Sequence, residues 1–194
     1  MENITFKQID KQQLVDLRYQ HAYHAGHLKG SINLNPKNFK KFGKNLLSTT
    51  EPLIFIVDSE VKEDLSGILE AAKEASFENV EGYIDIEDIS QKELATSEMI
   101  DAKTFLNKAD DDFILLDVRN QAEVTRPAPE KNLVKIAIDD LPNALDQLDA
   151  SKEIYTLCGS GNSSTSAASY LVEKGYKGVV FAGGMKAIEE ESKK

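Results

Sequence analysis

Short apolar runs alternate with helix-like segments along the second half of the chain. Three runs have the length and content of buried strands: Phe113–Asp117, Val134–Ile138 and Ile154–Leu157. Around them the pattern predicts a helix from the N-cap Asp101 to Lys108, a short helix over Pro142–Leu148, a helix over Ser164–Lys174, a last strand over Val179–Phe181 and a closing helix over Lys186–Glu191. Strands that alternate with helices predict an α/β fold, with a mostly parallel central sheet flanked by helices.

The chain also repeats itself weakly. The segment Leu14–Arg18 resembles Leu115–Arg119 at an offset of 101 residues, and Leu53–Asp58 resembles Glu153–Cys158 at an offset of 100. Landmarks at one near-constant offset indicate a duplicated unit of about 100 residues, which is a usual domain size. We therefore predict two tandem domains, 1–95 and 96–194, that meet near the polar stretch Ser90–Ser97.

Composition and charge exclude several classes of protein. The 194 residues include 23 Lys and Arg against 33 Asp and Glu, a formal charge of -10, which argues against a nucleic-acid partner because such proteins need a basic face. No stretch approaches the ~20 apolar residues that span a bilayer, and the start Met1–Ile4 is unlike a signal peptide, so we expect no membrane partner. The single cysteine, Cys158, excludes an intrachain disulfide and a multi-cysteine zinc site. These features favour a cytoplasmic protein without a metal or another cofactor.

The one cysteine lies at a chemically suggestive place. It ends a predicted buried strand and begins the loop Cys158-Gly159-Ser160-Gly161-Asn162-Ser163-Ser164, which leads into a helix. The glycines let the backbone curl with its N–H groups inward, Ser163 or Ser164 can cap the helix, and the helix start attracts anions. A thiol in such a cradle is shifted toward the nucleophilic thiolate. An inert buried cysteine is the alternative, but a core strand has no use for this loop.

These pieces resemble the rhodanese family of sulfurtransferases in its tandem form. In the second half the resemblance lies in Leu116–Arg119, in the loop Cys158–Ser164, in Ala167–Leu171 and in Gly183–Ala187. In the first half it lies in Val15–Arg18 and in the stretch Gly26–Asn33, similar to the family's Gly-His-Ile-Pro-Gly-Ala-Ile-Asn.

The resemblance implies sulfur transfer through a cysteine persulfide. Cys158 would take sulfane sulfur from thiosulfate or a persulfide, which is either a small molecule or a persulfidated protein. The loop residues Gly159, Ser160, Gly161, Asn162, Ser163 and Ser164 would hold the anion with their backbone N–H groups. Because the chain has no second cysteine, a separate thiol or another thiophilic molecule must accept the sulfur.

The sequence departs from active rhodaneses in two respects. Loop positions that often carry Arg or Lys are Gly159 and Ser163 here, which weakens attraction for an anionic donor. If the pocket borrows a cation from elsewhere, Arg126 and Lys131 are the first candidates. The first half has Asp58 at the position of Cys158, followed by an acidic segment without glycine, so we expect a non-catalytic first domain.

Other polar residues have simpler interpretations. Asp117 and Arg119 follow a strand, and the pair recurs as Asp16 and Arg18, which favours a structural salt bridge over acid–base chemistry. His21, His24 and His27 are spaced to share a helix face, and we interpret them as solvated surface residues rather than metal ligands.

Three functions remain open at this stage. The first is a sulfurtransferase that uses Cys158. The second is a degenerate rhodanese module that docks a protein or senses reactive sulfur, which the loss of the loop cations favours. The third, a cysteine-dependent phosphatase, is disfavoured because the Arg needed six positions after the cysteine is Ser164.

Overall fold

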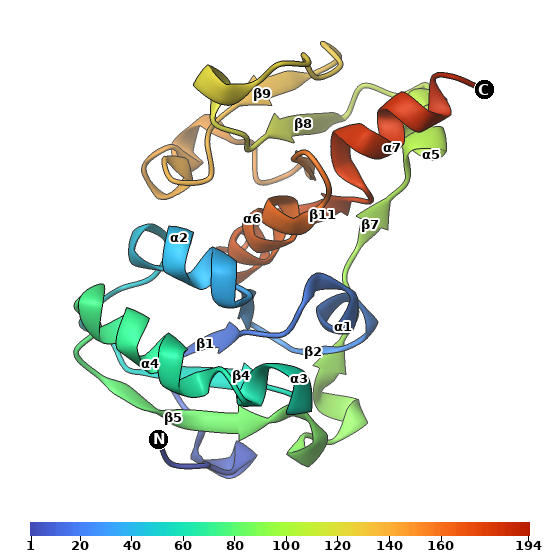
Figure 1. Cartoon of the computed structure of the whole chain (residues 1–194). Coiled ribbons are helices and arrows are strands. Elements are labelled where there is room, and N and C mark those ends of the chain that lie inside the picture. The colour runs from blue at the N-terminus through green and yellow to red at the C-terminus, as the bar shows by residue number, and fades with distance from the viewer. The chain divides into compact units, whose positions relative to one another are not determined.

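The computed structural model describes the whole chain, Met1–Lys194, as two compact units, Met1–Ser97 and Glu98–Lys194. Each unit contains its own parallel sheet of apolar strands and its own flanking helices (Figure 1). The predicted α/β fold with two parallel sheets is confirmed. No helix combines the length and the apolar character that crossing a membrane would require.

The sheet of the first unit has the strand order β3-β1-β4-β5, and all its strands are parallel. Its strands are β1 (Gln13–Asp16), β3 (Ile32–Asn33), β4 (Leu53–Val57) and β5 (Val80–Asp85). The helices and 3-10 turns are η1 (Phe6–Gln8), α1 (Gln20–Ala25), α2 (Pro36–Leu46), α3 (Ser59–Lys62), α4 (Leu65–Glu74), η2 (Ile86–Asp88) and η3 (Gln91–Glu93). A separate antiparallel pair joins β2 (His27–Leu28) to β6 (Leu94–Ala95).

The sheet of the second unit has the order β7-β11-β10-β8-β9, and it too is parallel throughout. Its strands are β7 (Met99–Ile100), β8 (Phe113–Asp117), β9 (Leu133–Lys135), β10 (Glu153–Leu157) and β11 (Lys177–Phe181). The helices and 3-10 turns are α5 (Ala102–Leu106), η4 (Gln121–Glu123), η5 (Leu141–Asn143), η6 (Leu145–Gln147), α6 (Asn162–Glu173) and α7 (Gly184–Glu191).

The second unit is covered by helices on both faces of its sheet. On one face, Phe105 of α5 lies among Phe113, Tyr155 and Phe181, with ring centroids 5.1 to 6.1 Å apart, and α7 adds Met185 and Ile188 to the same core. On the other face, α6 packs against β10 and β11. Gly178 of β11 permits this approach, since a Cβ there would lie 2.5 Å from a carbonyl oxygen of α6. The central strand β10 is thereby fixed from both sides.

The first unit covers one face of its sheet differently. The ring of Phe39 of α2 packs edge-to-face against Phe55 and tilted against Phe77, with centroids 5.2 and 5.6 Å apart, and α4 packs beside α2. The opposite face of β4 presents Ile54 and Ile56 to side chains of η1, η2, β2 and β6 rather than to α-helices. Each unit nevertheless has a buried central strand. All residues of β4 are buried, and so are all residues of β10 except Glu153 at its start.

Several predicted elements differ from the structure in detail. Asp101 does cap α5 by accepting a hydrogen bond from Thr104 N at 2.8 Å, but the helix ends at Leu106. The helix predicted over Pro142–Leu148 is instead two 3-10 turns, η5 and η6. The prediction that Ser163 or Ser164 caps α6 is wrong, because the helix begins at Asn162 and its N-cap is Gly161.

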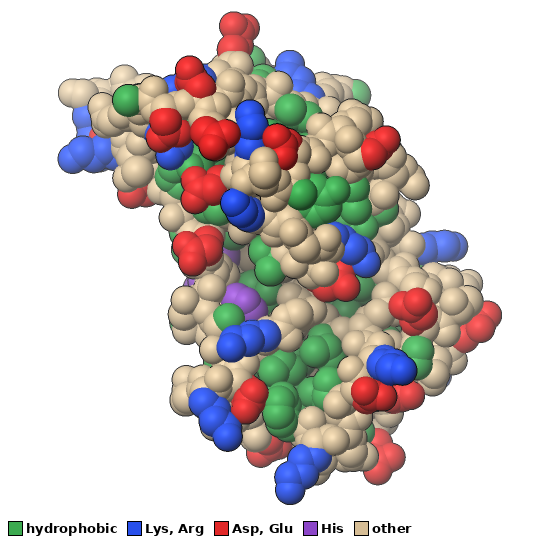
Figure 2. Space-filling view, turned by 180° about the vertical axis from the view of Figure 1, so that it is seen from behind, with side chains coloured by type: hydrophobic (Ala, Val, Ile, Leu, Met, Phe, Trp, Pro, Cys, Tyr) green, Lys and Arg blue, Asp and Glu red, His purple; other side chains and the backbone are tan.

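The charged side chains show no basic face in the view of Figure 2. Asp and Glu side chains alternate there with Lys and Arg, and apolar patches lie between them. This distribution agrees with a chain that carries a formal charge of -10.

Candidate active site

Cys158 directly follows β10, the strand that lies between β8 and β11. Because the three strands are parallel, their carboxyl ends meet at one edge of the sheet, where α/β proteins usually place reactive groups. The residue is only 5% exposed, so its thiol lies inside the loop rather than on the surface.

The loop after Cys158 curls around the sulfur. Gly161 adopts a left-handed conformation with φ 96°, which an L side chain rarely adopts, and α6 begins at the next residue. This curl directs two backbone N–H groups at the Sγ atom, from Gly161 at 3.1 Å and from Ser164 at 3.4 Å. The sulfur is therefore held where a negative charge would be stabilised by donors and by the start of a helix.

The remaining predicted loop residues line this curl to different extents. Ser164 is buried beside the sulfur, with its Oγ 3.5 Å from Sγ. Asn162 and Ser163 are half-buried, and Gly159 and Ser160 are exposed. The structure thus brings Gly161 and Ser164 to the thiol, while no hydrogen bond to Sγ comes from Gly159 or Ser160.

The start of α7 holds the loop from behind, a role that sequence reasoning missed. The backbone N–H groups of Met185 and Lys186 donate to the carbonyl oxygens of Cys158 at 2.9 Å and Gly159 at 3.1 Å. A Cβ on Gly184 would lie 2.3 Å from the Cys158 oxygen, so only glycine allows this approach. The sequence did single out the segment Gly183–Ala187, but only the structure shows that this segment supports the backbone of the Cys158 loop.

A buried threonine also supports the loop. Thr156 of β10 donates its hydroxyl to the carbonyl oxygen of Ser164 at 2.9 Å. This bond fixes the first turn of α6 over the strand that carries Cys158. A threonine within an apolar strand gave no sequence signal that distinguished it from ordinary strand residues.

Asp117 and Arg119 form a two-pronged ion pair next to the loop. The Asp117 carboxylate accepts hydrogen bonds from Arg119 Nε and Nη2, both at 2.8 Å, and Arg119 Nη1 donates to the Arg126 carbonyl at 3.0 Å. β8 runs beside β10 with Asp117 opposite Leu157, so the pair and the thiol share one edge. The hydrogen bonds that Arg119 donates to Asp117 raise the pKa of Arg119, and its electrostatic interaction with Cys158 raises it further.

Arg119 is therefore a cation near the thiol that a search confined to the loop overlooks. The side chains of the two candidates named from the sequence each pair with an acidic residue. Arg126 is an exposed residue whose guanidinium pairs with Glu189. Lys131 pairs with Asp111 at 3.0 Å, at the amino end of β8. That end is separated from the carboxyl edge by the length of the strand, roughly 16 Å.

The first unit has a carboxylate where the second has a thiol. Asp58 follows β4 and caps α3, and its Oδ1 accepts hydrogen bonds from Glu60 N at 3.0 Å and Val61 N at 3.1 Å. The Asp–Arg pair recurs, with Arg18 Nη2 2.7 Å from Asp16 Oδ2. No thiol lies at the end of β4.

The interpretation of the three histidines as surface residues is wrong for His27. This residue belongs to β2 and is only 9% exposed, because its ring stacks on Tyr23 at a centroid distance of 3.9 Å. Its Nδ1 lies 3.0 Å from the Tyr23 carbonyl oxygen. Burial lowers the pKa of His27, and it also lowers that of the half-buried His24.

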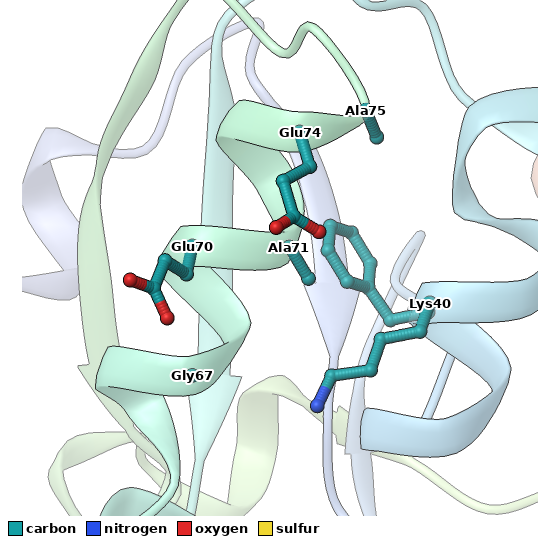
Figure 3. A pocket seen from close by; sticks show the side chains of 7 residues that line it. Lys40, Gly67, Glu70, Ala71, Glu74 and Ala75 are labelled. Carbon is teal, nitrogen blue, oxygen red and sulfur yellow. The ribbon is translucent and has the colours of Figure 1, made fainter.

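A hollow of about 480 Å³ lies between α2 and α4 of the first unit (Figure 3). Lys40 extends toward α4 from α2, and α4 contributes Gly67, Glu70, Ala71 and Glu74 to the lining. It lies between the covering helices rather than at the carboxyl edge of a sheet, and its lining contains no cysteine.

Comparisons with known proteins identify one family. The model of the rhodanese-like domain matches residues 5–84 and again residues 101–191. YtwF of Bacillus subtilis, whose name assigns it provisionally as a sulfurtransferase, is 38% identical over 86 residues, which cover 44% of this chain and 82% of YtwF.

Two solved structures illustrate the range of similar proteins. A rhodanese-related protein from Thermoplasma volcanium is 28% identical, with a TM-score of 0.42, and the match covers 48% of this chain and 92% of that one. A thiosulfate sulfurtransferase from Pseudomonas aeruginosa is 18% identical, with a TM-score of 0.43, over 94% of this chain and 36% of that one. Because its two halves each match the family model in turn, the chain belongs to the rhodanese-like domain family as a tandem member.

Proposed function

We propose that the protein is a sulfurtransferase that moves sulfane sulfur to a thiophilic acceptor through a persulfide on Cys158. One observation carries this proposal: the Sγ atom of Cys158 accepts hydrogen bonds from two inward N–H groups of a curled loop at the end of the central strand. Such a loop favours the thiolate, which is the nucleophilic form of cysteine.

The transfer takes place in two displacement steps. The Cys158 thiolate attacks the outer sulfur of thiosulfate, the Sγ–S bond forms, the S–S bond of thiosulfate breaks, and sulfite leaves with the electron pair. A persulfide anion reacts in the same way and releases a thiolate. An acceptor such as cyanide or a thiolate then attacks the outer sulfur, and the Cys158 thiolate is regenerated.

The acceptor is a separate molecule in this scheme, because the chain contains no second thiol. The donor is thiosulfate, a small persulfide or a persulfidated protein, and neither nucleic acid nor a membrane takes part. A reducing compartment such as the cytoplasm suits a lone reactive cysteine.

The charges around the loop favour persulfide donors over thiosulfate. Arg119 lies near Cys158, but Asp117 already neutralises it, and the loop itself contains no cation. We expect Ser163→Arg to raise the rate of loading from thiosulfate about tenfold at low salt, since a local cation attracts the dianion. Ser163→Gln matches the length without the charge and should give no gain; an equal gain from both variants would contradict the electrostatic explanation.

Mass spectrometry of the intact protein tests the proposed function. The protein is incubated with thiosulfate, and a second sample with a low-molecular-weight persulfide. A gain of one sulfur atom that is lost on addition of cyanide, and that is absent in Cys158→Ser, is the expected result. No gain with either donor would overturn the proposal and favour a docking or sensing module.

A further inference from the structure

The hydroxyl group of Ser164 is placed to change its role when Cys158 ionises. Ser164 has no exposed surface, and its Oγ lies 3.5 Å from the Cys158 Sγ. In the thiol form, the S–H group donates to Ser164 Oγ, while the Ser164 O–H group donates to the carbonyl oxygen of Gly161 at 2.9 Å. The hydroxyl therefore presents a lone pair to the sulfur and its proton to the backbone.

The carbonyl of Gly161 does not depend on Ser164 for a partner. Thr165 donates to the same oxygen twice, from its backbone N at 3.1 Å and from its hydroxyl at 2.8 Å. If the Ser164 proton rotates about the Cβ–Oγ bond toward Sγ, the carbonyl keeps two donors and no heavy atom moves. Hydroxyl protons rotate in this way to suit their neighbours.

We propose that Ser164 is a catalytic residue whose hydrogen bond with Cys158 reverses direction during the reaction. It accepts from the thiol, and it donates to the thiolate once the thiol proton has left to water. Oγ keeps its own proton throughout, and no covalent bond forms to Ser164. This inference rests on the proposed sulfur transfer and adds a third donor to the N–H groups of Gly161 and Ser164.

The reversal has different consequences for the two steps. The thiolate is the attacking group when Cys158 is loaded and the leaving group when the acceptor takes the sulfur. A donor that stabilises the thiolate increases its population at neutral pH, and it lowers the barrier to its departure from the persulfide. Sγ is uncharged in the persulfide, so the hydrogen bond strengthens as the charge returns to it.

The test compares Ser164→Ala with Ser160→Ala, which removes an exposed hydroxyl of the same loop that makes no hydrogen bond to Sγ. The rate of Cys158 alkylation by iodoacetamide is measured from pH 5.5 to 10 in each full-length protein. We expect the midpoint of the profile to rise by about one pH unit in Ser164→Ala and to stay in place in Ser160→Ala.

A second measurement separates a catalytic hydroxyl from a structural one. Persulfidated protein is mixed with cyanide, and the release of sulfur is followed with time. Release should slow about five- to tenfold in Ser164→Ala at every pH, whereas the slower loading should recover above the shifted midpoint. If Ser164→Ala does not fold, Ser164→Gly removes the same hydroxyl and replaces it in both measurements.

The outcomes distinguish this inference from the proposed function. An unchanged midpoint together with unchanged release would overturn the role of Ser164, even if the wild-type protein transfers sulfur. Failure of the wild-type protein to load sulfur would overturn the proposed function instead, while the alkylation midpoints would still show whether Ser164 stabilises the thiolate.

Discussion

The loops after β4 and after β10 occupy equivalent places in the two units, but their backbone N–H groups donate to different acceptors, a carboxylate in the first loop and a sulfur atom in the second. After β4, the Asp58 carboxylate occupies the donors of Glu60 and Val61 and caps a helix that starts at once. After β10, three residues separate Cys158 from α6, and the donors of Gly161 and Ser164 converge on sulfur instead. In the first unit a carboxylate of the chain itself occupies the backbone donors, whereas in the second unit the donors face a sulfur atom.

The difference between the two loops depends on their glycines as well as on the exchange of Asp58 for Cys158. The wider curl requires the left-handed Gly161 and the close approach of Gly184 from behind. The segment after Asp58 contains neither feature, since the chain turns directly into α3. A thiol alone would therefore not convert the first loop into the second.

The largest expected effect comes from moving the thiol. Cys158→Ser should reduce sulfur loading by at least ~10³-fold, because a serine hydroxyl is almost wholly protonated at neutral pH. Adding Asp58→Cys to this variant should restore no loading, since the first loop lacks the curl. Intact-mass spectrometry after incubation with either donor measures both results. Loading on the transplanted cysteine would show that the loop geometry is unnecessary.

The next effect comes from filling the space behind the loop. Gly184→Ala places a Cβ against the Cys158 carbonyl and should reduce loading at least ~10-fold, because the loop must shift. Gly175→Ala is the matched control, since Gly175 also has a positive φ of 85° but nothing lies within 4 Å of its added Cβ. Both variants should lose about 1 kcal/mol or more of stability from backbone strain. Equal loading by the two would show that the approach of Gly184 is irrelevant to the chemistry.

The contrast between the loops also shows how far the sequence could predict the molecule. The strands β8 and β10 and the parallel sheet followed from apolar runs, because burial on both faces imposes a local pattern that a sequence shows directly. The start of α6 was predicted two residues too late, because Gly161 caps it through backbone conformation and no side chain signals that.

Long-range contacts were the part that the sequence left open. Arg119 is two residues from Asp117 in the chain, so their pairing could be predicted, but its proximity to Cys158 depends on the pairing of β8 with β10. His27 was misjudged for the same reason, since its burial comes from stacking on Tyr23 and from the pairing of β2 with the distant β6. The local pattern of apolar residues predicts helices and strands, whereas the residues that become neighbours across a sheet are known only from the structure.

A smaller effect should follow when the first loop loses its carboxylate. Asp58→Ala removes two hydrogen bonds at the start of α3 and should cost about 0.5–2 kcal/mol of stability. Sulfur transfer should stay within a few-fold of wild type, because the first unit holds no cysteine. Asp64→Ala is the control for stability, since Asp64 precedes α4 without a capping hydrogen bond from its side chain. A fall in transfer as large as that of Cys158→Ser would show that the first unit takes part in the chemistry.

The smallest expected effect is a pH dependence of stability that belongs to the first unit, which contains all three histidines. Burial lowers the pKa of His27 below its ordinary value of 6.5, so the unfolded chain takes up the proton at a higher pH than the folded one. His27 therefore contributes full stability above pH 6.5 and loses it as the pH falls through 6.5 toward the folded value. His24 acts in the same direction, and Asp16, whose pKa burial raises, acts in the opposite one.

The difference between variants isolates the contribution of His27 from these neighbours. Urea midpoints are measured at pH 7.5 and 5.5 by circular dichroism for the wild type, for His27→Gln and for the exposed control His21→Gln. His27→Gln should show a smaller drop on acidification than the wild type, because it removes a group that takes up a proton on unfolding, and His21→Gln should show the wild-type drop. An equal or larger drop in His27→Gln would mean that His27 is already protonated in the fold, which its stacked and buried ring opposes.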